Sequence, residues 1–184
     1  YRNTGMVYYN LDQLDSAKKY FLKATKIPPC DPYANENYAS ANANYINPDF
    51  GNSPYDYQYF KIARSFYLKS IDCKKDFATA YKKLADLYVR GNKKDSALLT
   101  LQNCIATNPA NDEAHRNIGN YYLNILADNI NAELYLKKAT ELNPVNIDNY
   151  LALGRFYRRM KQRNRELSTY QSALTFLPGN KEIY

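Results

Sequence analysis

The sequence of 184 residues contains no tryptophan, only six glycines and a single histidine. It also lacks a run of about 18 apolar residues, which a membrane-spanning helix would need. The scarcity of glycine leaves no glycine-rich phosphate-binding loop, and the lack of long Val or Ile runs disfavours a buried parallel sheet. These absences favour a helical chain with no membrane span in this segment.

Histidine, which often carries catalysis or binds metals, occurs once, at position 115. A Ser-His-Asp or Cys-His arrangement would have to use that one ring, and a metal cluster of several histidines is excluded. Aspartate and glutamate are scattered over positions typical of solvated helix faces. We therefore predict no catalytic residue, no metal, no cofactor and no enzymatic activity.

The three cysteines, Cys30, Cys73 and Cys104, are too far apart in the sequence for a C-x-x-C zinc or redox pair. Their odd number and wide spacing favour reduced, structural thiols, which fits a reducing compartment such as the cytoplasm. The chain begins at Tyr1 with neither a methionine nor a charged-then-apolar leader. We expect a segment of a longer protein, so an export signal could lie outside these residues.

Basic residues outnumber acidic ones by 25 to 18, and the formal net charge is +7. This charge favours acidic partners through long-range attraction. The segment from Asn149 to Glu166 is especially basic, which raises the question of nucleic-acid binding. Most tyrosines, however, occupy the repeat positions described next, so few rings remain to stack on bases, and the pattern disfavours nucleic acid as a partner.

A pattern of aromatic, small and apolar residues recurs along the chain. Each unit has a first set at positions i, i+3, i+4 and i+7 and a second set at i, i+4 and i+7, and both spacings mark one face of a helix. The pattern advances by 34 residues from Tyr81 to His115 and by 35 from His115 to Tyr150. The clearest units contain Tyr81, Leu84, Ala85, Tyr88, Ala97, Leu101, Cys104 and Pro109; His115, Ile118, Gly119, Tyr122, Ala132, Leu136, Ala139 and Pro144; and Tyr150, Leu153, Gly154, Tyr157, Glu166, Tyr170, Ala173 and Pro178.

Each unit predicts a hairpin of two helices. The small residues Gly119 and Gly154 allow a neighbouring helix to approach closely, and Asn-Pro pairs beginning at Asn108 and Asn143 end the second helix. One hairpin cannot bury its apolar face alone, whereas stacked neighbours can. The sequence therefore predicts an all-α fold, an α-solenoid of stacked antiparallel helical hairpins.

This pattern resembles the tetratricopeptide repeat (TPR) family over nearly the whole chain. The resemblance implies a single array of about five repeats, wound as a right-handed superhelix. The expected repeats are residues 1–31, 35–77, 78–111, 112–146 and 147–180, and residues 181–184 would begin a further repeat. The second repeat is degenerate and contains an insertion near residues 46–58, whose Pro, Gly and Asn content predicts a loop. That loop is either an inert turn or a cover that touches the ligand.

In the resembled family the first helix of each repeat lines a concave groove that binds peptides. Helical geometry turns positions one, two, five, eight and nine after the first aromatic away from the packing face, and these positions include Leu123 and Ala152. Arginine and amide side chains there suit an extended or acidic peptide, although a basic surface that only aids solubility is the alternative. The candidate binding residues are Lys82, Lys83, Arg90, Arg116, Asn117, Asn120, Asn124, Arg155, Arg158 and Arg159.

Two features of this sequence depart from patterns of the family. Some members hold a C-terminal carboxylate in a clamp of Lys, Asn and Arg side chains, but only Lys82 and Asn117 match it and Asp86 would repel a carboxylate, so we reject this role. Glu166 stands where the other repeats have alanine, at the close crossing of two helices. We expect a salt bridge to a nearby arginine or a local shift of the helix, because an unpaired buried carboxylate is costly.

The sequence thus predicts a non-enzymatic scaffold or adaptor that binds a protein or peptide partner with acidic groups. One alternative is a regulatory or substrate-presenting arm of a larger enzyme, such as a glycan transferase or ligase. Another is a binder of nucleic acid or a different anionic polymer, whose affinity would fall steeply with salt. The abundance of Asn, Lys, Tyr and Ile suggests an AT-rich, bacterial genome.

Overall fold

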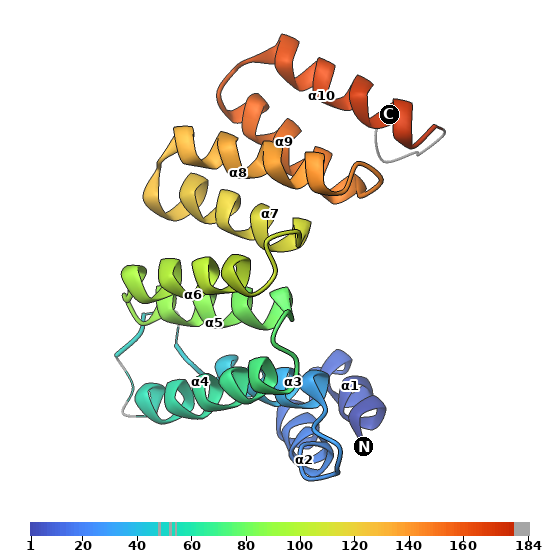
Figure 1. Ribbon diagram of the computed structural model, residues 1–184. Helices are drawn as coiled ribbons and strands as arrows, with labels where there is room; N and C mark the ends of the chain where they lie inside the picture. The colour runs from blue at the N-terminus through green and yellow to red at the C-terminus, as the bar shows by residue number, and fades with distance from the viewer. Residues whose placement is uncertain (48, 52, 54, 179–184) are drawn as a thin grey trace. The chain divides into compact units, whose positions relative to one another are not determined.

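The computed structural model describes residues 1–47, 49–51, 53 and 55–178, and every regular element in this part of the chain is a helix (Figure 1). The all-α prediction is therefore confirmed. Residues 181–184, where a further repeat was expected, and Pro48, Asn52 and Pro54 of the expected insertion lie outside the described residues. The elements are α1 (Arg2–Asn10), α2 (Leu14–Ala24), α3 (Pro32–Ala43), α4 (Asp56–Cys73), α5 (Ala78–Arg90), α6 (Lys94–Thr107), α7 (Asp112–Tyr121), η1 (Tyr122–Leu126), α8 (Asn129–Leu142), α9 (Ile147–Arg159) and α10 (Arg163–Phe176).

The chain divides into two compact units, a first unit, Tyr1–Thr107, and a second unit, Asn108–Tyr184. In the first unit α1 packs on α2, α3 on α4 and α5 on α6 (Figure 1). In the second unit α7 packs on α8 and α9 on α10. Each pair is an antiparallel hairpin, so the prediction of stacked hairpins is confirmed within each unit.

A small residue lies where the two helices of a hairpin cross. Ala17, Ala63, Ala97 and Ala132 are completely buried. On the facing helix of the fourth hairpin, a Cβ added at Gly119 would lie 2.8 Å from Cγ of Leu136. Close approach lets each hairpin bury an apolar face against its neighbour, and this burial is the main favourable contribution to the stability of stacked hairpins.

The fourth hairpin accommodates one additional residue in a π-helical turn. Seventeen residues separate His115 from Ala132, whereas sixteen separate Tyr81 from Ala97. The turn η1 directly follows α7 and absorbs the difference. It places Leu123 in the core of the second unit, 7% exposed, so the prediction that Leu123 faces outward is wrong.

Ala152 was also predicted to face outward, and that prediction is wrong as well. It is 2% exposed and belongs to the same core cluster as Leu123 and Leu136. The spacing rule failed here because the first helices of neighbouring hairpins, α7 and α9, also pack on one another. One edge of the supposed outward face is therefore an interior surface of the second unit.

The expected insertion joins α3 to α4, and its described part is tied to the start of α4. The carboxylate of Asp56 is buried and accepts hydrogen bonds from the backbone amides of Asn47, Gly51 and Ser53 at 3.0, 3.0 and 3.1 Å. These amides, that of Asn47 foremost, hold the pKa of Asp56 below its ordinary value. A single side chain thus organises the connection.

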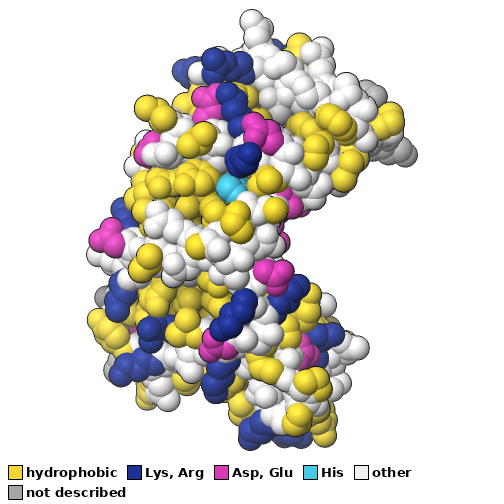
Figure 2. All heavy atoms as spheres, viewed as in Figure 1, with side chains coloured by type: hydrophobic (Ala, Val, Ile, Leu, Met, Phe, Trp, Pro, Cys, Tyr) yellow, Lys and Arg dark blue, Asp and Glu magenta, His cyan; other side chains and the backbone are white. Residues whose placement is uncertain are grey.

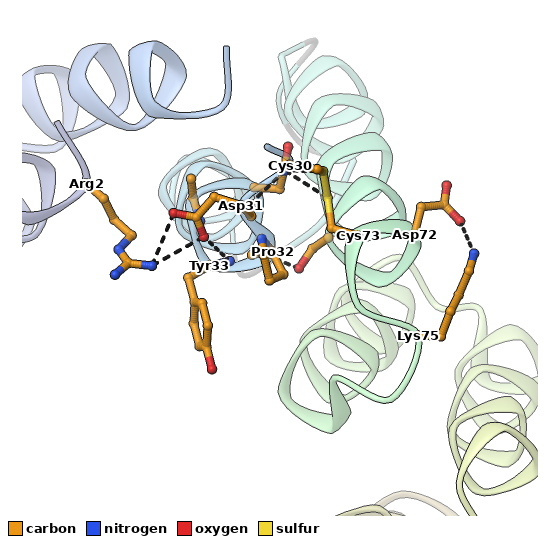
Figure 3. The surroundings of a disulfide bond; sticks show 11 residues. Arg2, Cys30, Asp31, Pro32, Tyr33, Asp72, Cys73 and Lys75 are labelled. Carbon is orange, nitrogen blue, oxygen red and sulfur yellow. Dashed lines mark hydrogen bonds and ion pairs between the residues drawn. A yellow bond between two sulfur atoms is a disulfide. The ribbon is translucent and has the colours of Figure 1, made fainter. Parts of the chain in front are cut away.

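A disulfide joins Cys30, just before α3, to Cys73, the last residue of α4, with the two Cα atoms 5.7 Å apart (Figure 3). The bond closes the end of this hairpin that lies opposite its long connection. The prediction of reduced thiols is therefore wrong for these two cysteines. They no longer favour a reducing compartment. Cys104 is the remaining cysteine, and it is buried.

The residue after Cys30 fixes the start of α3. Asp31 caps the helix by accepting a hydrogen bond from the backbone amide of Tyr33 at 2.9 Å. Arg2 of α1 forms an ion pair with the same carboxylate at 3.2 Å, as Figure 3 shows. The ion pair therefore ties the start of α3 to α1, and the disulfide ties it to the end of α4.

Candidate functional site

In the first unit, the candidate Lys83 on α5 reaches back to α3. Its ammonium donates hydrogen bonds to the carboxylate of Glu36 and, at 3.1 Å, to Oγ of Ser40. The side chain of Glu36 is only 7% exposed, so Lys83 supplies the charge that makes its burial tolerable. Ser40 also contacts the hydroxyl of Tyr67 at 3.1 Å, and burial raises the pKa of that phenol. Lys83 therefore belongs to a polar network that joins α3 to α5.

The other two candidates of the first unit, Lys82 and Arg90, are exposed but also have partners. Nζ of Lys82 lies 2.8 Å from a carboxylate oxygen of Asp86, one turn further along α5. Nη1 of Arg90 donates to the backbone oxygen of Ala43 at 3.3 Å. Because Asp86 partly neutralises Lys82, this lysine attracts an anion less strongly. This agrees with our rejection of a carboxylate clamp.

In the second unit, Asn149 joins the beginnings of α7 and α9. Its side chain is completely buried, and its amide nitrogen donates to the carboxylate of Asp112 at 2.8 Å and to the backbone oxygen of Ala139 at 2.9 Å. Burial raises the pKa of Asp112, but hydrogen bonds from Asn149 and Asn146 outweigh it, and the net pKa lies below the ordinary value. Asn149 was not among the predicted binding residues, because the groove positions were counted only after the first aromatic of each repeat.

This network holds the candidate Arg116 in one orientation. Nη1 of Arg116 donates to the amide oxygen of Asn149 at 2.7 Å, and Nη2 lies 3.8 Å from the carboxylate of Asp148. The side chain of Arg116 is 16% exposed, so part of the guanidinium remains open to solvent. A guanidinium fixed in this way loses little entropy when it binds a further acceptor.

A second polar contact joins the end of α9 to η1, the turn that follows α7. Nη1 of Arg159, at the end of α9, donates to the amide oxygen of Asn124, in the π-helical turn, at 2.9 Å. Asn120, which is half-buried, and Arg155, which is exposed, lie on the surface between this contact and that of Arg116. We call this surface the α7–α9 face; its residues are Arg116, Asn120, Asn124, Arg155 and Arg159. The candidate Asn117 is instead buried, 8% exposed.

The basic stretch at the end of α9 separates into residues with different partners. Nε of Arg158 donates to Oε1 of Glu166 on α10 at 2.7 Å, which confirms the predicted salt bridge at this unusual position. Arg155 forms no ion pair among the described residues. Figure 2 shows further Lys and Arg side chains over the turn between α9 and α10, where Lys161 and Arg163 lie. Of the three arginines of the α7–α9 face, Arg116 and Arg159 have polar partners, and Arg155 is therefore the one most available to a ligand.

The single histidine has a structural contact. Nε2 of His115 lies 2.9 Å from the backbone oxygen of Pro109, and the ring packs beside Tyr135. Within the described part of the chain, no three His, Cys, Asp or Glu side chains gather in a way that could hold a metal ion. Nor is any helix of that part both long enough and apolar enough to cross a membrane.

Comparison with known proteins identifies one repeat by its sequence. A family model described as a tetratricopeptide repeat matches residues 3–29. Among curated proteins, the chain is similar to the UDP-N-acetylglucosamine--peptide N-acetylglucosaminyltransferase of Giardia intestinalis, with 29% identity over 126 residues. Those residues are 68% of this chain but only 8% of that protein, so the chain spans a small part of the relative's length.

Solved structures resemble the whole chain. A thermophilic TPR protein of Thermus thermophilus has a TM-score of 0.66 and 22% identity, over 99% of this chain and 92% of that one. YrrB, a TPR protein described as having an unusual peptide-binding site, has a TM-score of 0.53 and 17% identity, over 99% of this chain and 87% of that one. At these identities the similarity establishes the fold and leaves the ligand open.

Proposed function

Because the chain has the fold of the tetratricopeptide repeat proteins, and one repeat that their family model matches, we propose that it is a protein-interaction module. This fold is typical of scaffolds that hold a protein or peptide partner. We further propose that the ligand is an extended segment with acidic side chains and that it lies on the α7–α9 face of the second unit.

The observation that carries this proposal is the contrast between Arg155 and the cations near it. Arg158 and Arg116 are engaged with Glu166 and with Asn149, whereas Arg155 is exposed and forms no ion pair among the described residues. A guanidinium can bind a carboxylate with two parallel hydrogen bonds. The neighbouring amide of Asn120 can both donate to and accept from the backbone of an extended peptide, whatever its sequence. Together they suit a peptide with an acidic residue.

The experiment begins with a random-peptide display library selected on the purified chain, so that the ligand is not assumed. The enriched sequences are synthesised and titrated by calorimetry against the parent chain and against Arg155→Glu. We expect enrichment in Asp and Glu, and a loss of affinity of at least about tenfold in the variant, because one charge-assisted contact is replaced by repulsion.

Arg163→Glu is the matched control, since Arg163 is an exposed arginine at the start of α10 and the substitution changes the net charge equally. An equal loss in both variants would mean that only the overall charge matters. Enrichment of peptides without acidic residues would refute the acidic ligand. A ligand whose affinity falls as steeply with salt as that of a nucleic acid would favour an anionic polymer instead.

A second candidate function rests on the similarity to the Giardia protein, which by its name is a glycosyltransferase. The present chain would then be the substrate-presenting arm of a larger enzyme. The complete coding sequence tests this proposal, which requires a transferase domain in the same polypeptide. Both functions use the same kind of peptide-binding surface, and only the second requires that domain.

A further inference from the structure

The first unit contains a second surface with the chemistry of a binding site. It is a pocket of about 430 Å³ where α4 begins and α5 ends, and Figure 2 shows Lys, Arg and hydrophobic side chains mixed at this end of the unit. None of the candidate residues of the first unit lines it. We call it the aromatic–basic pocket; its principal residues are Tyr57, Phe60, Lys61, Arg64, Tyr88 and Lys93.

Aromatic rings form the apolar part of this pocket. Phe60 is 6% exposed and is fixed by edge-on contact with Phe50, with ring centroids 5.4 Å apart, and by Tyr88 at 6.2 Å. A Cβ added at Gly91 would lie 2.8 Å from Phe60, so the glycine leaves room for this ring. Tyr57 is 59% exposed and contacts Phe50 at 5.0 Å, so its ring stands at the rim.

Three cations surround these rings, and no carboxylate of the described residues lines the pocket. Nε of Arg64 donates to the hydroxyl of Tyr88 at 2.8 Å, which orients the guanidinium. Nζ of Lys93 lies 5.6 Å from the centroid of Phe60, and Lys61 is exposed one turn before Arg64 on α4. None of the three forms an ion pair within the described part of the chain, so their positive charges are not neutralised locally.

A ligand for this site must combine an apolar ring with a negative charge. The ring would pack on Tyr57, which stands exposed at the rim, and the anion would accept hydrogen bonds from Arg64 and the lysines. Single-stranded nucleic acid suits the site less well, because successive bases stack on several exposed rings, and of the rings that line this pocket only Tyr57 is exposed. The volume lies within the range of about 300–1,000 Å³ that is usual for pockets that hold a small group.

We propose that the aromatic–basic pocket binds a tyrosine side chain that carries a phosphate or sulfate ester, presented by a partner protein. Such a residue supplies the ring and the oxyanion in one side chain. The pocket is made entirely of residues of the first unit, so its test is independent of the proposal for the α7–α9 face.

The test uses the full chain and four peptides of otherwise identical sequence, which carry phosphotyrosine, sulfotyrosine, tyrosine or phosphoserine at the central position. We expect at least one of the two modified tyrosines to bind at least about tenfold more tightly than both tyrosine and phosphoserine, and the comparison of the two distinguishes phosphate from sulfate. Arg64→Gln and Lys93→Gln should each remove most of that advantage without changing the thermal midpoint, since both residues are exposed.

Lys19→Gln is the matched control, because Lys19 is an exposed lysine of the first unit that does not line the pocket. Equal binding of phosphoserine and phosphotyrosine would overturn the proposal, since the rings would then contribute nothing. An equal effect of Lys19→Gln and Lys93→Gln would also overturn it, as would displacement of the peptide by a single-stranded oligonucleotide of higher affinity. Failure of both modified tyrosines to bind would refute it directly.

Discussion

Nε of Arg158 lies 2.7 Å from Oε1 of Glu166, and this ion pair joins the two helices of the last hairpin. The two partners differ in environment, because the side chain of Glu166 is 13% exposed and that of Arg158 is 66% exposed. The carboxylate has therefore lost most of its water, while the guanidinium has kept it. Its hydrogen bond with Glu166 raises the pKa of Arg158, which keeps the pair charged.

This asymmetry predicts opposite effects of removing the two partners. Arg158→Ala should lower the thermal midpoint, because it leaves a mostly buried carboxylate without its cation. Glu166→Ala should leave the midpoint unchanged or raise it, since alanine occupies the equivalent crossing in Ala17, Ala97 and Ala132. Circular dichroism melts of both variants and the double variant check this. A double variant that melts as low as Arg158→Ala would contradict it.

The disulfide between Cys30 and Cys73 should contribute substantially to the stability of the first unit. It closes a loop with a sequence separation of 43 residues, which includes the long connection between α3 and α4. A crosslink that closes a loop of this length restricts the unfolded chain. We therefore expect Cys73→Ser to lower the free energy of unfolding by about 2–4 kcal/mol. Urea titrations should show this difference under oxidising conditions. With excess dithiothreitol the two proteins should unfold alike, and a difference that persists would point to packing rather than to the bond.

The carboxylate of Asp56 predicts a pH-dependent stability. Its pKa is lowered in the folded state by the backbone amide of Asn47 and those of Ser53 and Gly51, so the folded protein binds a proton less readily than the unfolded chain. Its contribution to stability is therefore fully present above the unfolded pKa of about 3.9 and is lost as the pH falls through the lower folded pKa. Asp56→Asn should be less stable at pH 7, and the difference from the parent should shrink toward pH 2. Urea midpoints across this range measure it, and a constant difference would contradict the assignment.

The repeating core of the fold was predictable because it follows simple helical spacing. Buried positions such as Ala97, Leu101 and Ile118 lie on one face of their helices, and this local periodicity is clear in the third and fourth hairpins. The π-helical turn was not predicted, although the extra residue between His115 and Ala132 was its signal. The disulfide was missed because the cysteines were compared only along the sequence. An antiparallel hairpin brings the start of its first helix beside the end of its second.

The candidate site was less predictable than the core. Spacing can indicate which face of a helix a residue occupies, but it does not reveal the partner of that residue. Lys83 is held by the buried Glu36, and Arg116 by the buried Asn149, and both partners lie outside the recurrent pattern. That the ten candidate residues bind a ligand stays a prediction. Substitutions of Arg155 and Asn120 would test it most directly.

The two glycines of the second unit predict different responses to the same substitution. A Cβ at Gly119 would lie 2.8 Å from Cγ and 3.1 Å from the backbone nitrogen of Leu136, a completely buried residue that cannot move aside. At Gly154 the three atoms nearest to the new Cβ would all belong to the far end of the Tyr170 ring, and Tyr170 is half-buried. Alanine is favoured over glycine inside a helix by about 1 kcal/mol, so that gain applies at both sites.

Gly119→Ala should therefore lower the free energy of unfolding by about 1–3 kcal/mol, because overpacking outweighs the gain in helix propensity. Gly154→Ala should stay within about 1 kcal/mol of the parent, because the ring of Tyr170 can swing outward. Chemical denaturation of the two variants side by side measures the difference, and each serves as the control for the other. Equal losses would show that the exposed edge of Tyr170 is as rigid as the buried core, whereas no loss at Gly119 would mean that α7 and α8 can separate without cost.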